Sequence, residues 1–120
     1  MEYASGNIFI RTQGPMAKDI QSISHQHNFD HTTYVAKGAF SIEQLEPVAF
    51  DADKQPTEFR TVRKVEKSAA DLKNWVLVKA NTWHRLTALE DDSVYHCLYS
   101  HHTPQGDIVQ EYDGWMESYN

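Results

Sequence analysis

The sequence predicts an all-β fold, either a sandwich or a barrel. Apolar and polar residues alternate along most of the chain, and this period of two is typical of strands with one buried face. Gly, Pro, Asn and Asp separate the alternating segments at short, fairly regular spacing, which predicts roughly eight to ten strands. The 120 residues, 40% hydrophobic and 23% charged, have the length and composition of a globular chain with one core. We therefore expect residues 1–120 to form a single domain.

The N-terminal segment predicts one strand and then an extended stretch. Residues 7–12 combine apolar and β-favouring side chains, and Gly14 and Pro15 end this strand. Residues 19–27 alternate in hydropathy, and the Asn-Phe-Asp sequence at 28–30 predicts a turn.

A hairpin is predicted next. Residues 31–36 are rich in Thr, Tyr and Val, and Lys37 and Gly38 form a tight turn in which Gly38 adopts a positive φ. Residues 39–45 return as the partner strand, which Pro47 is expected to break.

The middle of the chain has weaker patterns. Residues 50–57 resemble a turn, and residues 58–67 predict a strand or a hairpin. Residues 68–73 are compatible with one short helical turn, and the apolar residues 75–79 predict a buried strand.

The C-terminal third predicts further strands and a tail. Residues 81–82 form a turn between the buried strand and the next one. The expected elements are strands at 84–89 and 93–100, a turn at 104–107 leading into 108–112, and a tail at 114–120 docked through Trp115.

Composition excludes several classes of partner. The formal net charge of −6 argues against nucleic acid, because phosphate binding needs a basic surface. No apolar stretch approaches the roughly 18 residues of a membrane helix, and the N-terminus lacks the features of a signal peptide. Cys97 is the single cysteine, so an internal disulfide is impossible. We expect a cytoplasmic protein without a membrane or nucleic-acid partner.

Four histidines carry the strongest functional signal. His25, His27 and His31 lie within seven residues and share one parity, so an extended chain turns their imidazoles to the same side. His84 follows on a separate predicted strand and can complete the set. Imidazole is a good ligand for zinc, copper, iron and nickel. The pattern therefore predicts a metal site with one ion inside the β fold, against the alternative that some of these histidines are surface or core residues.

The spacing of these histidines resembles the first motif of the cupin family. That motif is a His-x-His pair, three or four residues, a Glu, six residues and a Gly. Here His25 and His27 form the pair, His31 stands in the place of the Glu, and Gly38 follows at the expected distance. The leading glycine of the motif is replaced by Asp19.

The second cupin motif, Pro-x-Gly-x-x-His, is matched less closely. Residues 79–84 read Lys-Ala-Asn-Thr-Trp-His, so His84 is retained and Asn81 replaces the Gly. Asn tolerates a left-handed turn better than other non-glycine residues, so this change leaves the fold possible. Lys73 replaces the leading glycine of this motif, and Ala88 replaces its final Asn. The resemblance covers residues 16–101.

The resemblance implies a cupin jelly-roll β-barrel (a double-stranded β-helix) with a metal in its mouth, and a homodimer. The histidine in the place of the Glu is similar to a subgroup with a four-histidine site, which makes His25, His27, His31 and His84 the metal ligands. The alternative is a three-histidine site with His31 beside it, as in cupin thiol and diketone dioxygenases. The implied cofactor is a divalent transition metal, with iron or manganese favoured and nickel, copper or zinc possible.

Several other side chains are candidates for the pocket wall. Small four-histidine cupins often place a cysteine that looks into the barrel at the position of Cys97, and Tyr99 shares its parity. Tyr34, Phe40 and Trp83 are candidates to line a pocket for an apolar or aromatic substrate, although such residues are more commonly plain core.

The resemblance leaves three functions open. The first is a metal-dependent oxidoreductase, similar to cupin dioxygenases, acting on a small organic substrate. The second is a non-catalytic module that binds metal and a small ligand, which the degenerate second motif favours. The third is a lyase or isomerase, for which Tyr34 or Tyr99 is the available type of base.

Overall fold

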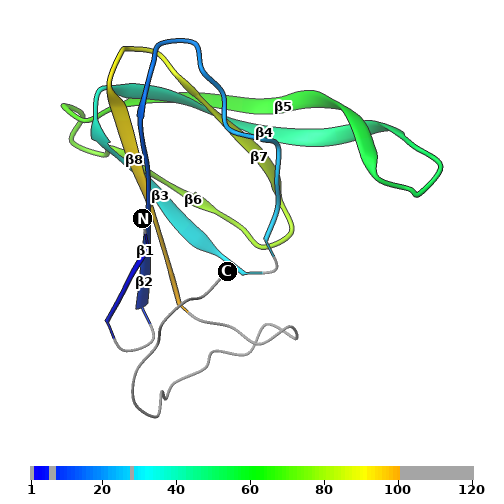
Figure 1. Cartoon of the computed structure of the whole chain (residues 1–120), viewed down its shortest axis with the longest axis horizontal. Helices are drawn as coiled ribbons and strands as arrows, with labels where there is room; N and C mark the ends of the chain where they lie inside the picture. The colour runs from blue at the N-terminus through cyan, green and yellow to red at the C-terminus, as the bar shows by residue number, and fades with distance from the viewer. Residues whose placement is uncertain (1, 6–7, 28, 101–120) are drawn as a thin grey trace.

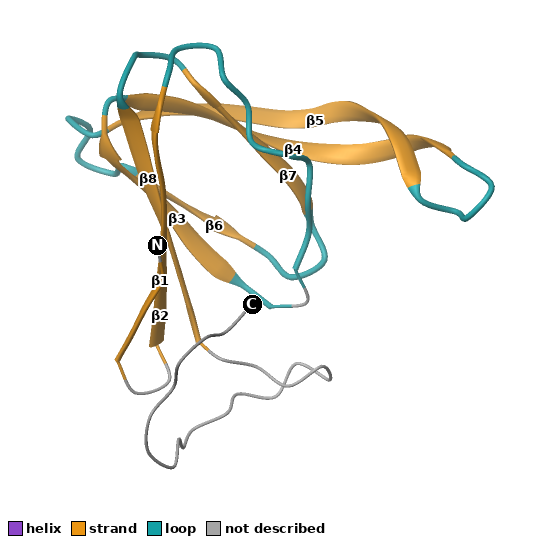
Figure 2. Ribbon diagram, in the orientation of Figure 1, coloured by secondary structure: helices purple, strands orange, loops and turns teal. Residues whose placement is uncertain are grey.

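A computed structural model describes residues 2–5, 8–27 and 29–100. These residues form eight strands and no helix. Figure 2 shows the strands and the loops that connect them. The strands are β1 (Glu2–Ser5), β2 (Ile8–Met16), β3 (His31–Lys37), β4 (Ala39–Phe50), β5 (Pro56–Ser68), β6 (Trp75–Val78), β7 (Trp83–Ala88) and β8 (Ser93–Ser100). The predicted elements at 104–112 and 114–120, with Trp115, lie outside the described residues.

The strands form two antiparallel sheets that face each other. One sheet has the order β1-β2-β8-β3-β6 and the other has the order β5-β4-β7 (Figure 1). Strands that are neighbours in a sheet are often far apart in the sequence, as in the β2–β8 and β3–β8 pairs, which is the connectivity of a jelly roll. The described strands leave the two sheets separate and do not close into one continuous barrel.

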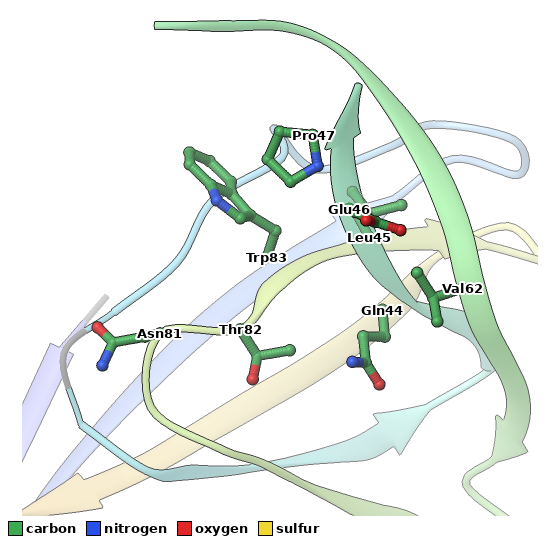
Figure 3. A pocket seen from close by; sticks show the side chains of 8 residues that line it. All are labelled: Gln44, Leu45, Glu46, Pro47, Val62, Asn81, Thr82 and Trp83. Carbon is green, nitrogen blue, oxygen red and sulfur yellow. The ribbon is translucent and has the colours of Figure 1, made fainter. Parts of the chain in front are cut away.

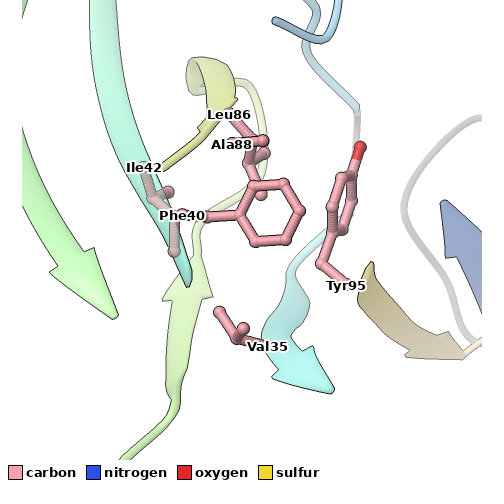
Figure 4. Close-up of a cluster of buried hydrophobic side chains, with 6 residues drawn as sticks. All are labelled: Val35, Phe40, Ile42, Leu86, Ala88 and Tyr95. Carbon is pink, nitrogen blue, oxygen red and sulfur yellow. The ribbon is translucent and has the colours of Figure 1, made fainter. Parts of the chain in front are cut away.

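The core lies between the two sheets. It contains Val35, Phe40, Ile42, Leu86, Ala88 and Tyr95, which Figure 4 shows converging from both sides. The rings of Phe40 and Tyr95 meet edge to face with their centres 5.1 Å apart. Phe40, a candidate for the pocket wall, is fully buried in this cluster because alternate residues of β4 point inward.

The hairpin between β3 and β4 has the predicted form. Gly38 adopts a φ of 73°, as its place in the tight turn requires. A Cβ atom at Gly38 would lie 2.2 Å from Oγ of Ser93, so a larger residue would also collide with the start of β8.

Three predicted strand ends and turns differ in the structure. Gly14 and Pro15 do not end their strand, because β2 continues to Met16 with an irregularity in the register between Gln13 and Met16. Pro47 does not end its strand, because β4 continues to Phe50 with an irregularity in the register between Pro47 and Ala49. Residues 68–73 form a hydrogen-bonded turn, in which the backbone N–H of Asp71 donates to the carbonyl of Ser68 (3.0 Å), and not a helical turn.

Strand β6 is less buried than predicted. Trp75 and Leu77 are 48% and 47% exposed, because β6 is the edge strand of its sheet and only alternate residues face the core. Val78, on the inward face, is buried and pairs with His31.

Candidate metal centre

The four histidines come from three places in the chain that the fold brings together. His31 is the first residue of β3, and His84 is the second residue of β7 in the opposite sheet. The extended segment before β3 runs beside β7, and an isolated bridge pairs His25 with His84. His27 lies two residues further along and on the same side of that segment, as its parity predicts.

The four imidazole rings face one another. The ring centres of His25 and His84 are 4.0 Å apart, and those of His25 and His27 are 5.0 Å apart. The ring of His31 lies 5.1 Å from that of His27 and 5.0 Å from that of His84. One nitrogen from each of His25, His27 and His84 lies within 4.8 Å of the other two, a spacing that can hold a metal ion.

Backbone carbonyls orient two of the rings. Nδ1 of His84 is 2.9 Å from the carbonyl oxygen of Thr82, and Nδ1 of His25 is 2.8 Å from that of Ile23. A carbonyl oxygen only accepts, so Nδ1 donates its proton in both contacts. In a neutral ring, Nε2 then keeps a free lone pair for a metal, which is the usual arrangement of a metal-binding histidine.

Buried nitrogens without partners mark the centre of the cluster. Nε2 of His84 and both ring nitrogens of His31 are buried, and none has a hydrogen-bond partner among the described residues. Buried polar atoms in folded proteins are rarely left unpaired, since each one carries a desolvation cost of about 1–3 kcal/mol. A divalent cation would satisfy these lone pairs, so the residues fit a metal.

The rings of His27, His31 and His84 are neutral at ordinary pH. Burial, reinforced by the neighbouring histidines, lowers the pKa of His27 to about 4 and that of His31 to about 3. Burial also lowers the pKa of His84 to about 4, although the hydrogen bond to Thr82 acts in the opposite direction. Neutral imidazole is the form that binds a metal, so protons do not compete for these ligands at pH 7.

Aromatic residues extend from the cluster along one side. The ring of Phe29 stacks on His27 with the centres 5.0 Å apart, and Tyr99 stacks on Phe29 at 4.9 Å. Tyr99 also stacks on Phe9 at 5.3 Å. Tyr99, which was predicted to line the pocket, therefore contacts the histidine cluster indirectly, through the ring of Phe29.

The remaining candidates have different surroundings. Tyr34 is on the face of its sheet opposite His31, where its ring lies 5.2 Å from that of His96. Cys97 packs against the core, with its sulfur 3.3 Å from Oγ1 of Thr33, and burial raises the pKa of its thiol. Trp83 lies beside His84 in the chain and lines a pocket where β7 begins.

The turn that precedes β7 contains interactions that the sequence did not reveal. Asn81 has a φ of 61°, the left-handed conformation expected for the residue that replaces glycine. Its backbone N–H donates to the carbonyl of His27 (2.6 Å), and the N–H of Ala80 donates to Oδ1 of Asp30 (2.7 Å). This turn therefore holds the segments of His27 and His84 together.

Comparison with solved structures identifies the class of fold. No protein-family model and no curated protein matches the sequence. A cupin-2 domain containing protein from Shewanella frigidimarina NCIMB 400 superposes with a TM-score of 0.53 at 11% identity, covering 82% of this chain and 76% of that one. KdgF from Halomonas sp. superposes with a TM-score of 0.51 at 23% identity, covering 83% of this chain and 86% of that one.

This chain therefore has the cupin fold, with a cluster of histidines suited to a metal inside it. The resemblance of the two motifs to those of cupins had predicted both the fold and the histidine cluster. The described residues contain no helix long and apolar enough to cross a membrane.

Proposed function

We propose that this protein is a metal-dependent oxidoreductase of the dioxygenase type that acts on a small organic substrate. The observation that carries the proposal is the group of four facing imidazoles, in which buried nitrogens of His31 and His84 lack any partner among the described residues. His25, His27, His31 and His84 are the proposed ligands. Iron or manganese is the proposed metal, and nickel, copper and zinc are compatible with the same donors.

Each histidine has a definable task in this proposal. His25 and His84 present Nε2, since their Nδ1 atoms are held by backbone carbonyls. His27 lies on the same extended segment as His25, and His31 approaches from the first position of β3 in the facing sheet. Four neutral ligands leave the positive charge of the metal undiminished, and the bound metal supplies a Lewis acid able to accept oxygen atoms of a substrate.

The surroundings favour chemistry without a strong base. Among the described residues, no carboxylate belongs to the cluster, and the nearby Asp30 is engaged with Ala80 and Lys79. A lyase or isomerase would need a base beside the substrate, and Tyr34 lies on the opposite face of its sheet. Tyr99, joined to His27 through Phe29, is the phenol that such an activity would use.

Metal analysis followed by oxygen consumption tests the proposal. The purified protein should contain about one transition-metal ion per chain, and the iron- or manganese-loaded form should consume oxygen with one of four substrate classes: catechols, diketones, thiols or alkenes. His96→Ala is a matched control, because His96 lies on the outer side of its sheet and bonds to Thr12 (2.7 Å). Stoichiometric metal without oxygen consumption in any class would support the second candidate, a non-catalytic module that binds metal and a small ligand, which the lack of a carboxylate in the cluster favours.

We also propose that the protein is a cytoplasmic homodimer. The support for a dimer is the outer face of the larger sheet, where Trp75 and Leu77 are each about half exposed on an edge strand. A second copy can cover such an apolar face. The single cysteine supports a reducing compartment, because such a chain uses no internal disulfide.

A further inference from the structure

A pocket lies near the candidate metal centre, where β7 begins. Its volume is about 370 Å³, within the size range of small-molecule sites. Figure 3 shows its wall, formed by the β4–β5 hairpin on one side and by the turn before β7 on the other. The lining residues are Gln44, Leu45, Glu46, Pro47, Val62, Asn81, Thr82 and Trp83.

The register of the strands places this pocket next to the candidate metal centre. Gln44 is the partner of His84 across the β4–β7 ladder. Side chains of such partners share one face, with their Cβ atoms roughly 4.5–5.5 Å apart. Thr82 accepts the hydrogen bond from Nδ1 of His84 and also lines the pocket. A molecule that touches Gln44 and Thr82 is therefore one side chain away from a proposed ligand.

The opposite side of the pocket is apolar and aromatic. Leu45 and Trp83 are also a cross-strand pair, one position along, so their side chains lie on the other face of the sheet. The indole of Trp83 is supported by Phe59, with ring centres 5.0 Å apart. The lining thus combines side chains from both faces of the sheet, with Gln44 on the face of His84 and Leu45 and Trp83 on the other.

Irregularities in the pairing of β4 with β5 lie beside this wall. Between Gln44 and Leu45 the extra residue is Val62 of β5, and between Pro47 and Ala49 it is Val48 of β4. Such bulges redirect side chains and are common beside active sites. Val62, the extra residue of the first bulge, lines the pocket together with residues 44–47.

The charges of the lining select against an anionic ligand. Glu46 is the only ionisable residue in the described lining, and its carboxylate accepts a hydrogen bond from the guanidinium of Arg60. No lysine, arginine or histidine is among the described lining residues, so an anionic group would have no cationic partner there. The amides of Gln44 and Asn81 and the hydroxyl of Thr82 offer neutral donors and acceptors.

We propose that this pocket binds the uncharged, planar part of a substrate whose oxygen atoms bind the metal. The inference rests on the proposed function, since it assigns the metal to one end of the substrate and Trp83 to the other. The substrate class is thus a small molecule with a chelating, oxygen-bearing head and a neutral aromatic or similarly flat tail. A substrate with a carboxylate or phosphate on its tail is excluded by the same charges.

Hydroxamic acids test this division, because their oxygen pair binds metals and their tail can be varied. The probes are acetohydroxamic acid, benzohydroxamic acid and 4-carboxybenzohydroxamic acid, titrated calorimetrically into manganese-loaded protein. Benzohydroxamic acid should bind at least about tenfold more tightly than acetohydroxamic acid, whose tail is too short for the pocket. The 4-carboxy compound should lose most of this advantage.

Variants assign the effect to the pocket. Trp83→Ala should abolish the preference for the aromatic tail while leaving metal content and acetohydroxamic acid binding unchanged, and Trp83→Phe should retain most of the preference. Val62→Lys, at a position 54% exposed, should shift the preference toward the 4-carboxy compound. Phe50→Ala is the control, since Phe50 is exposed near the hairpin tip and lines no part of the pocket.

Three results would overturn the inference. Equal affinities of the wild-type protein for the acetyl and benzoyl probes would show that the pocket holds no tail. Equal weakening of both probes by Trp83→Ala would assign Trp83 to the metal centre or to folding. A protein that retains none of the proposed metals, measured by elemental analysis before titration, would refute the proposed function and this inference together, whereas failure of the tail preference with manganese present refutes this inference alone.

Discussion

His25 and His84 exchange two backbone hydrogen bonds. The N–H of His25 donates to the carbonyl of His84 (3.1 Å), and the N–H of His84 donates to the carbonyl of His25 (2.9 Å). Two residues that face each other in this way project their side chains to the same side of the ladder. The short distance between their imidazoles is therefore set by the backbone, and it exists before any metal binds.

Removal of single histidines should empty the metal centre. We expect His27→Ala and His84→Ala to lower metal occupancy by more than about tenfold at limiting metal, because each removes one of the three nitrogen donors that lie within 4.8 Å of one another. Elemental analysis of the purified variants provides the measurement, and His96→Ala should keep the wild-type content. Full metal in both variants would show that these histidines are not the ligands.

His31 should contribute less than the other ligands. Its nitrogens lie outside the group of three that meet within 4.8 Å, so we expect His31→Ala to weaken metal binding without abolishing it. His31→Glu should restore the commoner set of three histidines and one carboxylate and retain metal. Pulsed electron paramagnetic resonance of the manganese form would count the coordinated imidazoles, and a count of three in the wild-type protein would contradict the four-histidine assignment.

The metal-free protein should become less stable on acidification. His27, His31 and His84 have folded pKa values of about 4, 3 and 4, below the ordinary value of 6.5, so the unfolded chain binds protons first. Stability is then fully present above about pH 6.5 and is lost as the pH falls toward 4, by about 1.4 kcal/mol per histidine for each pH unit of this window. Urea unfolding of the metal-free protein between pH 7 and pH 4.5 measures the slope.

His31→Gln provides the comparison for this slope. It removes one of the three groups, so the dependence of unfolding free energy on pH should become shallower. A stability that stays constant across the same range would mean that these imidazoles are already accessible to protons in the folded state.

The thiol of Cys97 should not take part in turnover. Burial raises its pKa, so little thiolate exists at pH 7, and the sulfur is in contact with Thr33. We expect Cys97→Ser to leave turnover within about tenfold, a barrier change of roughly 1.4 kcal/mol. Steady-state kinetics on the active substrate, with metal content checked in parallel, decides this. Complete loss of turnover with metal retained would make the thiol a participant.

The oligomeric state can be tested at the outer face of the larger sheet. Light scattering at micromolar concentration should give about twice the chain mass of 13.8 kDa. The double variant Trp75→Glu, Leu77→Lys should yield monomers, because it places charges on the edge strand that we propose a second copy covers. Phe50→Ala should remain dimeric. A wild-type monomer in the same measurement would disprove the dimer.

The sequence predicted the histidine cluster well because parity is a local property. His25, His27 and His31 needed only an extended chain to share one side, and the motif spacing supplied His84. The left-handed conformation of Asn81 was predictable from its place in the second motif.

Burial and strand ends were harder to predict, because they depend on neighbours in space. Trp75 was predicted to be buried because it lies in an apolar segment, but β6 is an edge strand and leaves its side chain about half exposed. Pro47 is tolerated because β4 has by then passed its last pair with β7, Leu45 with Trp83, and continues with β5 alone. Tyr34 and Phe40 were placed near the pocket by residue type, whereas the pleat turns Tyr34 outward and packs Phe40 into the core.

The register of β7 has a consequence for insertions and deletions. His84 faces the other histidines, while the next residue, Arg85, faces the opposite side and pairs with Glu43 (3.1 Å). An insertion or deletion of one residue in the turn at 79–82 that shifted β7 by one position would turn Arg85 toward the histidines and His84 away from them. It would replace a neutral ligand with a permanent cation at the centre and leave the carboxylate of Glu43 without its arginine. The length of that turn is therefore expected to be far less variable than its composition.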